Sequence, residues 1–490
     1  MSSEVGEGGD NIIALDKDGK KVYGFRRNWS GSRALAVDEE AFWAGLWQVN
    51  ALIRVKFDTG ELIGWRRPAG RISEVKLNGP IHSIGLGKET AYVVVDKSDK
   101  QPQPSLVLIE KTQARIIKEI PQKEAYAITV TGDDRIYASM SDGVFLIDPE
   151  TGNRTEVTLE GLEKNGAITS DKDGNLYVFD DGADQQVKAF DSSGKLLFAI
   201  GEKGGQKGLK YNHNALRRVA GIAVDAEGMI WITEYDSVRR QSLWDKQGKL
   251  QKEFIGNATY GASHMALHDQ DSKRGFAYGV LYDLDPSQLQ YYQPLQYLDE
   301  ADKSGREIYI HQGNLVPGLA FFHRGQLFSS EVSGQKRDYY VNNSTAIGCE
   351  LFIYKEGGFV PVAAIMGVHE HQGQPHSIYR RTGDSAGTTY FWWDKNEDGK
   401  IQDDEVEYIS AERLNAGYLW TTLIGPDLTF YIAGKQIAPT GFTASGAPKY
   451  GNQETIGGGC ESKRFLLHPR REASDIHARQ SRDIRVHRRT

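Results

Sequence analysis

The chain has 490 residues, 39% of them hydrophobic, with 54 glycines and only 15 prolines. This composition is typical of a globular protein with a large core, and it excludes a disordered or membrane-embedded chain. The formal charge is −7, but residues 464–490 hold eight arginines and three acids, so the first 463 residues carry 51 basic and 63 acidic side chains. The acidic body argues against nucleic acid as a partner, and no apolar run is long enough to span a membrane.

From residue 11 onward, short apolar segments alternate with glycine-containing turns, and helical periodicity is scarce. Residues 1–10 are expected to be a flexible N-terminus. The first two predicted strands, residues 11–15 and 21–25, flank the turn from Asp16 to Gly19 and have the pattern of an outer hairpin. We expect this hairpin to complete the last repeat, near residues 418–433, and so to close a ring without free sheet edges.

The clearest repeat is an apolar strand, an Asp-x-x-Gly turn and a second apolar strand. Two copies contain the turns from Asp171 to Gly174 and, 54 residues later, from Asp225 to Gly228. Weaker copies begin near residues 34, 81, 125, 263, 319, 376 and 418. Intervals of about 40 to 55 residues are those of four-stranded propeller blades. The sequence therefore predicts an all-β fold, a single β-propeller over residues 11–445 with seven or eight blades, six being the alternative.

The second copy, Ile-Ala-Val-Asp225-x-x-Gly228 followed by Ile-Trp-Ile-Thr-Glu234, resembles NHL-repeat propellers, as does the aromatic residue before its second glycine turn. The resemblance covers roughly residues 160–260. Met229 stands where the family usually has Asn, and Arg239-Arg240 where Asn-x-Arg is usual. Together with the calcium-loop motif described below, the chain resembles uncharacterised secreted bacterial propellers, which implies a fold more than a function.

NHL propellers grade into the SMP-30/gluconolactonase-like superfamily, in which a Glu, an Asn and an Asp hold a catalytic divalent metal. Asn165 matches the Asn, but Ala220 stands where the resemblance requires the Asp. Residues 79–82, at an early blade start, lack the Glu. We therefore expect no lactonase activity of that form.

Residues 394–405 have the spacing of an EF-hand calcium loop. The predicted ligands are Asp394, Asn396, Asp398, the carbonyl of Lys400, Gln402 and Glu405. Gly399 permits the sharp bend, and the aromatic residues 388–393 before the loop favour a strand over a helix. We expect the loop to join strands and to act as a structural clip, since it lacks the paired helices of a sensor. The alternative is an acidic turn that binds no metal.

Three predicted blade starts carry a histidine, namely His82, His264 and His376, and His369 and His371 precede the last of these. Neutral imidazoles that converge at a central channel would suit zinc, copper or iron, or supply a general base. The alternative is that these histidines cap strand ends by hydrogen bonding and never meet.

No motif names a catalytic residue, because nucleophile elbows, phosphate-binding loops and dinucleotide fingerprints are absent from the sequence. We expect a calcium-stabilised scaffold that binds a protein, a small molecule or a carbohydrate on one propeller face. The aromatic residues have two alternative roles, stacking on a sugar or packing in the core. They include Trp43, Trp47, Trp392 and Trp393. The alternative function is a metal-dependent hydrolase or oxidoreductase that uses the channel histidines.

Two further expectations concern the surroundings of the protein. A calcium loop of this class favours the periplasm or the extracellular space, although the sequence shows no secretory signal. Cys349 and Cys460 lack the spacing of metal ligands and are expected to be free thiols. The Arg-rich residues 446–490 are expected to be a disordered or truncated tail.

Overall fold

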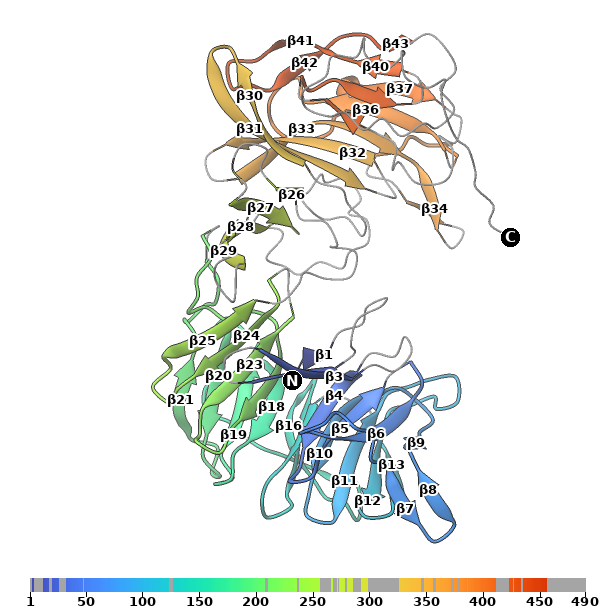
Figure 1. Ribbon diagram of the computed structural model, residues 1–490, viewed down its shortest axis with the longest axis vertical. Coiled ribbons are helices and arrows are strands. Elements are labelled where there is room, and N and C mark those ends of the chain that lie inside the picture. Colours follow the sequence, from blue (N-terminus) through green and yellow to red (C-terminus); the bar gives the residue numbers. More distant parts are fainter. Residues whose placement is uncertain are drawn as a thin grey trace, which may run out of the picture. The chain divides into compact units, whose positions relative to one another are not determined.

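The protein is an all-β protein (Figure 1), which confirms the predicted fold class. The computed structural model describes residues 2–3, 12–16, 20–25, 32–46, 48–122, 127–207, 210–235, 238–255, 266–267, 271, 273–277, 280–284, 292–297, 326–344, 348–355, 358–371, 374–376, 379–385, 387–410, 423–425, 427–432 and 435–455. Besides strands, the described residues contain one short 3-10 helix, η2 (Asp403–Glu405). No helix among them is long and apolar enough to cross a membrane.

The chain divides into two compact units. Unit 1 comprises Met1–Ser263 and Tyr278–Arg306, and unit 2 comprises His264–Ala277 and Glu307–Thr490. The first two sheets of unit 1 contain β1 (Ser2–Ser3), β2 (Ile12–Leu15) and β3 (Lys21–Phe25), then β4 (Ser32–Val37), β5 (Ala41–Leu46), β6 (Ala51–Lys56) and β9 (Glu74–Lys76). A separate hairpin of β7 (Trp65–Arg67) and β8 (Gly70–Ile72) precedes β9.

Four further sheets of unit 1 are four-stranded antiparallel meanders in chain order. They contain β10 (Ile81–Leu86), β11 (Thr90–Val95), β12 (Ser105–Glu110) and β13 (Ile116–Pro121); β14 (Ala127–Val130), β15 (Ile136–Met140), β16 (Gly143–Ile147) and β17 (Arg154–Glu156); β18 (Asn165–Ser170), β19 (Leu176–Asp180), β20 (Gln186–Phe190) and β21 (Leu196–Ile200); and β22 (Val219–Val224), β23 (Ile230–Glu234), β24 (Arg240–Trp244) and β25 (Leu250–Ile255). A further pair is β28 (Val280–Leu284) and β29 (Tyr292–Tyr297).

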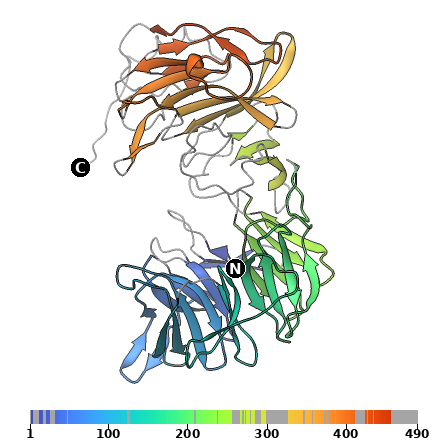
Figure 2. The same cartoon turned by 180° about the vertical axis from the view of Figure 1, so that it is seen from behind.

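The sheets of unit 1 stack face to face, because alternate residues of each strand point to opposite faces. In β5, Phe42 packs toward β2 and β3, whereas Trp43 packs toward the sheet that begins with β10. In β19, Val178 packs toward the sheet of β14–β17 and Tyr177 toward that of β22–β25. The first strands of successive sheets, β4, β10, β14, β18 and β22, lie beside one another. This stacking, visible from both sides (Figures 1 and 2), is that of propeller blades.

The recurrent Asp-x-x-Gly turn closes the first hairpin of a blade through its carboxylate. Asp171 accepts hydrogen bonds from two backbone N–H groups at 2.9 Å and from the Tyr177 hydroxyl at 3.2 Å. Asp225, one repeat later, accepts a bond from Trp231 Nε1 at 3.1 Å. Gly174 completes the turn at φ +81°, a conformation that glycine adopts without steric cost. In both copies of the turn motif, the aspartate therefore accepts a hydrogen bond from an aromatic side chain of the next strand.

Unit 2 is built differently. Its largest sheet has six strands, β30 (Gln326–Val332), β31 (Gln335–Ser344), β32 (Gly348–Lys355), β33 (Gly358–Gly367), β36 (Thr389–Trp393) and β37 (Val406–Ser410). A second sheet contains β38 (Leu423–Ile424), β39 (Phe430–Ile432), β40 (Lys435–Ile437) and β43 (Glu454–Thr455). Hairpins are formed by β26 (Ala266–Leu267) with β27 (Arg274–Ala277), β34 (His369–His371) with β35 (Gln374–His376), and β41 (Pro439–Phe442) with β42 (Pro448–Tyr450).

The repeats predicted near residues 34, 81, 125, 167 and 222 are confirmed as four-stranded sheets. The repeat predicted near residue 376 is instead a two-stranded hairpin, because β33 pairs with β36 and leaves β34 and β35 to pair with each other. The predicted starts at residues 319 and 418 lie outside the described residues, whereas β26 to β29, which follow residue 263, form one four-stranded sheet. The number of blades stays a prediction.

Two boundary predictions are wrong, and a third is not tested. The hairpin of β2 and β3 does not complete a sheet near residues 418–433, since β38 and β39 find their partners in β40 and β43. Ser2 and Ser3 pair with β2, and the flexibility of residues 1–10 stays a prediction. The strands extend beyond residue 445 to Thr455, because Tyr450 is buried among the core residues of unit 2.

Candidate functional site

The EF-hand-like segment, residues 394–405, connects β36 to β37 within the six-stranded sheet of unit 2. The prediction that the loop joins strands is therefore confirmed. Trp392 of β36 pairs with Val406 of β37, so the two ends of the loop are held side by side by the sheet. The last three loop positions form η2.

The first and last predicted ligands are both buried. Asp394 and Glu405 are each 2% exposed. Asp394 Oδ2 accepts a hydrogen bond from the backbone N–H of Gly399 at 2.9 Å, and Glu405 accepts bonds from Trp392 Nε1 at 2.9 Å and the Lys395 N–H at 2.8 Å. Burial, and then the charge of Glu405, raise the pKa of Asp394 above its usual range. The charge of Glu405 thus disfavours the charged form of Asp394, and a bound cation would relieve this.

The predicted ligands between these two are more exposed and shape the loop. Asn396 Oδ1 accepts a bond from the Asp398 N–H at 3.0 Å, and Asp398 Oδ1 accepts one from the Lys400 N–H at 2.8 Å. The Lys400 N–H, followed by Gln402, lowers the pKa of Asp398. Gly399 lies at φ +70°, as its predicted role in the bend requires. In the described residues, no three His, Cys, Asp or Glu side chains are gathered as a metal site.

The loop also contacts other parts of unit 2. Glu397 forms an ion pair with Lys355 of β32 at 3.3 Å and accepts a hydrogen bond from Ser445, in the turn between β41 and β42. The Asp394 N–H donates to the carbonyl of Val362 in β33 at 3.0 Å. The loop therefore connects β32, β33 and the β41–β42 hairpin to the pair of β36 and β37.

The predicted histidines lie on different elements of the chain. His82 is exposed at the second position of β10 in unit 1, and His264 lies outside the described residues. In unit 2, His369 of β34 pairs directly with His376 of β35, and His371 lies two positions along β34. Convergence of His82, His264 and His376 at one channel stays a prediction.

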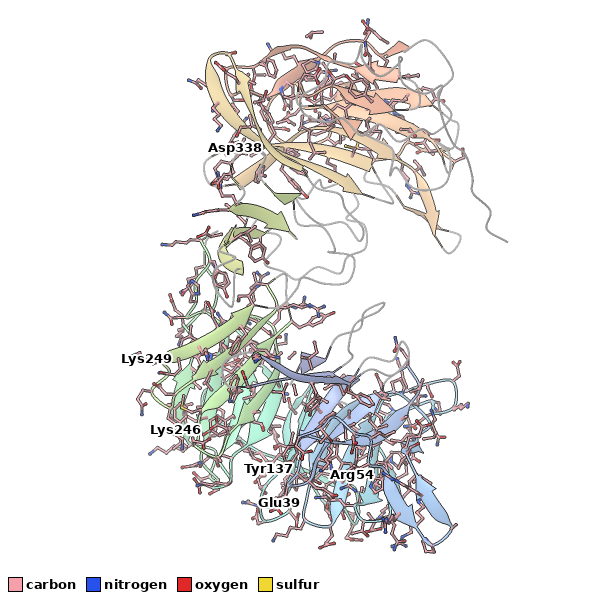
Figure 3. The ribbon with its side chains drawn as sticks, viewed as in Figure 1. Glu39, Arg54, Tyr137, Lys246, Lys249 and Asp338 are labelled. Carbon is pink, nitrogen blue, oxygen red and sulfur yellow. The ribbon has the colours of Figure 1, made fainter. Side chains whose placement is uncertain are left out.

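Two of the tryptophans considered for sugar stacking are core residues. Trp43 and Trp392 are 0% exposed, and Trp393 packs in part against the core of unit 2. Trp43 donates to Asp38 at 2.8 Å, and its ring lies 5.1 Å from the guanidinium of Arg54, which Figure 3 labels. Stacking of these two tryptophans on a sugar is therefore excluded by burial. Trp47 lies outside the described residues.

Of the two cysteines, Cys349 is a free thiol, as expected. It is fully buried in unit 2, and burial raises the pKa of its thiol well above the usual value. A buried, protonated thiol is chemically inert. Cys460 lies outside the described residues.

The structure also shows a small polar pocket that sequence reasoning missed. It lies in unit 1 and is lined by Gln206, Tyr211, Asn212, Ala215, Arg217, Glu234, Val238 and Arg240. Two adjacent arginine pairs mark it in the sequence, Arg217-Arg218 before β22 and Arg239-Arg240 at the start of β24. The pairs are 22 residues apart, and only the antiparallel pairing of the sheet brings them together.

Comparisons with known proteins find no matching family model and no matching curated protein. Among solved structures, virginiamycin B lyase from Staphylococcus aureus is 15% identical, with 58% of this chain and 87% of that chain covered and a TM-score of 0.34. Hydrazine synthase from Kuenenia stuttgartiensis is 13% identical over 65% and 94% of the two chains, also at 0.34. The Swd1 β-propeller domain from Myceliophteria thermophila is 10% identical over 64% and 93%, again at 0.34. Likeness at this level says nothing of activity.

Proposed function

We propose that this chain is a calcium-stabilised β-propeller protein that serves as a scaffold for a ligand or a partner protein. The observation that supports calcium binding is the burial of both Asp394 and Glu405 at the first and last positions of an EF-hand-spaced loop. Calcium takes six to eight oxygen ligands, and this spacing offers them from a single turn. A calcium loop of this class suits a protein of the periplasm or the extracellular space.

The role proposed for the ion is mechanical. The loop is attached to β32, β33 and the β41–β42 turn through Glu397 and Asp394. An ion held by Asp394 and Glu405 would remove the repulsion between their charges and draw these attachments together. Because the loop joins two strands of one sheet, ion binding has no helix pair to open.

Thermal unfolding in calcium and in a chelator tests this role. At a calcium concentration 100 times the dissociation constant, a ligand that binds only the folded state adds about 2.7 kcal/mol of stability. Glu405→Gln removes the closing carboxylate and should abolish the calcium-dependent rise in Tm. Asp404→Asn is the matched control, since it removes an exposed charge at a neighbouring position that is not a predicted ligand. An equal calcium response in wild type and Glu405→Gln would refute the clip.

The scaffold role rests on the arrangement of the blades. In each meander of unit 1, the turn between the second and third strands and the connection to the next sheet lie at the same end of the strands. Polar side chains from two different turns are thereby brought together, as in the pocket between the β21–β22 connection and the β23–β24 turn. Loops on a rigid β framework are common binding surfaces.

A second candidate function, a metal-dependent hydrolase or oxidoreductase, is favoured by the register of β34 and β35. His369 and His376 are direct partners, and His371 follows His369 by two residues. Positions two apart on a strand share a face with the cross-strand partner. Three imidazoles are also the ligand set of some catalytic zinc sites, which keep a fourth position open for water.

Elemental analysis of the purified protein tests this candidate. A site in the hairpin predicts a stoichiometric transition metal that is lost in His369→Ala/His371→Ala/His376→Ala and kept in His82→Ala. A channel site shared with His82 predicts loss in both variants. Wild-type protein without transition metal would exclude both sites.

A further inference from the structure

A short segment of unit 2, residues 379–385 between β35 and β36, contacts the calcium loop from outside. The Tyr379 hydroxyl donates a hydrogen bond to Asp403 Oδ1 at 2.7 Å, and Arg381 Nη2 donates to the carbonyl of Val406 at 3.2 Å. Asp403 is the tenth position of the loop, and Val406 directly follows the last position. Neither of these two contacted residues is a predicted calcium ligand.

These two contacts are made at the two ends of η2, the short helix that carries the closing ligand Glu405. Asp403 is the first residue of η2, and Val406 is its C-cap, whose N–H donates to the Asp403 carbonyl. The N-cap residue, Gln402, makes no side-chain capping bond. The backbone that carries Glu405 is therefore held at both ends by side chains of residues 379–381, which lie outside the loop.

The two donors are themselves fixed. Arg381 Nε donates to the Tyr379 hydroxyl at 3.0 Å, and the Arg381 backbone N–H donates to Asp384 Oδ2 at 2.5 Å. Asp384 also accepts the hydroxyl of Tyr390, in β36, at 2.9 Å. The rings of Tyr379 and Tyr390 meet edge to face with their centroids 5.1 Å apart. The segment is thus attached to the strand before the loop as well as to the helix at the end of the loop.

The hydrogen bonds run in one direction, from a cation to a carboxylate. Arg381 donates to Tyr379, and Tyr379 donates to Asp403. Burial raises the pKa of Tyr379, and it raises the pKa of Tyr390 to about 12, so both hydroxyls remain protonated donors at neutral pH. Bonds with a charged donor or acceptor are stronger than bonds between neutral groups. The chain of bonds is therefore suited to fixing Asp403.

We propose that Tyr379 and Arg381 are positioning residues for calcium, which hold η2 so that Glu405 can close the set of ligands. Residues that orient the ligands of a metal commonly change its affinity by about tenfold to a hundredfold when they are mutated. The inference rests on the calcium half of the proposed function, and it identifies residues outside the loop that set calcium affinity. Since such coupling is reciprocal, calcium in turn immobilises residues 379–385.

Calorimetric titration of the full chain with calcium chloride tests the proposal. Tyr379→Phe removes the hydroxyl and should weaken calcium binding by about tenfold. Arg381→Gln should also weaken it, although removal of a cation near an acidic loop would by itself strengthen calcium binding. Arg380→Gln is the matched control, because it removes the same charge from the neighbouring exposed position and should not weaken binding.

A second control tests the loss of a tyrosine hydroxyl from the same sheet. Tyr408 of β37 is 51% exposed, and its hydroxyl makes no hydrogen bond in the part of the chain that the structure describes. Tyr408→Phe should therefore leave calcium affinity unchanged. Hydrogen-exchange mass spectrometry adds an independent measurement: calcium should protect residues 379–385 in wild type and should not protect them in Tyr379→Phe.

A purely structural role would lower the Tm of Tyr379→Phe in chelator and leave its calcium dissociation constant unchanged, which would overturn the proposal. Equal strengthening of calcium binding by Arg381→Gln and Arg380→Gln would overturn it too. If Tyr379→Phe does not fold, Asp403→Ala should bind calcium more weakly than Asp403→Asn, because the asparagine oxygen still accepts the hydroxyl of Tyr379. Absence of calcium binding in wild type would refute the clip as well, whereas binding that is unaffected by Tyr379→Phe would refute only the positioning role.

Discussion

Three charged side chains meet beneath the turn between β19 and β20. Lys188 Nζ donates to Asp180 at 2.6 Å and to Asp184 at 2.8 Å, with Lys188 3% and Asp180 0% exposed. Asp180 also accepts the backbone N–H of Lys164, just before β18, at 3.1 Å. The cluster therefore joins the turn to the start of its own blade. Burial of a cation is tolerated here because the two carboxylates compensate it.

Lys188→Met tests this cluster. The substitution leaves Asp180 buried without its cation, and removing one partner of a buried pair costs about 3 to 5 kcal/mol. We expect a loss of that size in the free energy of unfolding, measured by urea denaturation. Lys172→Met, at an exposed position in the first turn of the same sheet, should change stability by less than about 0.5 kcal/mol. Equal effects of the two variants would contradict the role of the buried pair.

The same cluster predicts a dependence of stability on pH. Burial alone would raise the pKa of Asp180, but Lys188 and the backbone N–H groups hold it below the ordinary value of 3.8. A lowered folded-state pKa means that the stabilisation is present above pH 3.8 and is lost as the pH falls through the folded-state pKa. Urea midpoints of wild type should therefore fall as the pH drops below about 4. In Asp180→Asn, this part of the acid sensitivity should be missing.

At the scale of elements, glycine has different roles in the two hairpin turns of one blade. Gly194, between β20 and β21, lies at φ +85°, and a Cβ there would stand 2.1 Å from the carbonyl oxygen of Thr158. Gly174, between β18 and β19, lies at φ +81° with no atom within 4 Å of a Cβ. The Gly194 carbonyl also accepts the Glu160 N–H at 2.9 Å. The second turn is therefore packed against the segment that precedes the blade, and the first is not.

Alanine substitutions at the two positions distinguish the energetic cost of the backbone conformation from the cost of disturbed packing. Gly174→Ala should cost about 1 to 2 kcal/mol, the penalty of a left-handed conformation for a residue with a Cβ. Gly194→Ala should cost about 1 to 3 kcal/mol more, because the Thr158 carbonyl has to move. Urea denaturation of both variants measures the difference. Equal losses of stability in the two variants would contradict the close approach of Gly194 to the Thr158 carbonyl.

At the scale of the whole molecule, the division into two units predicts where calcium acts. The loop and its contacts, β32, β33 and the β41–β42 hairpin, all belong to unit 2. We expect calcium to slow amide hydrogen exchange in β36, β37 and β42, and to leave β18–β21 of unit 1 unchanged. Hydrogen-exchange mass spectrometry with calcium and with a chelator measures this. Equal protection in both units would contradict a clip confined to unit 2.

The features that were predicted correctly depend on contacts between near neighbours in the chain. The turn at Asp171 is closed by bonds to residues two to six positions away, and the loop from Asp394 to Glu405 is contained in twelve residues. Such contacts follow from residue type and spacing, so the turns, the blade repeats of unit 1 and the strand–loop–strand setting could be predicted from the sequence.

The remaining features depend on contacts between distant segments. β33 pairs with β36, which makes the large sheet of unit 2. β38 and β39 share a sheet with β40 and β43 and not with the N-terminal hairpin. Both results reflect competition among many apolar strands for partners. The approach of Arg217 and Arg240 likewise depends on the folded sheet. The amino-acid sequence by itself determined the all-β class, the turn chemistry and the calcium-loop spacing. Only the tertiary structure decided which strands pair, because that choice is governed by burial over the whole chain and not by local residue spacing.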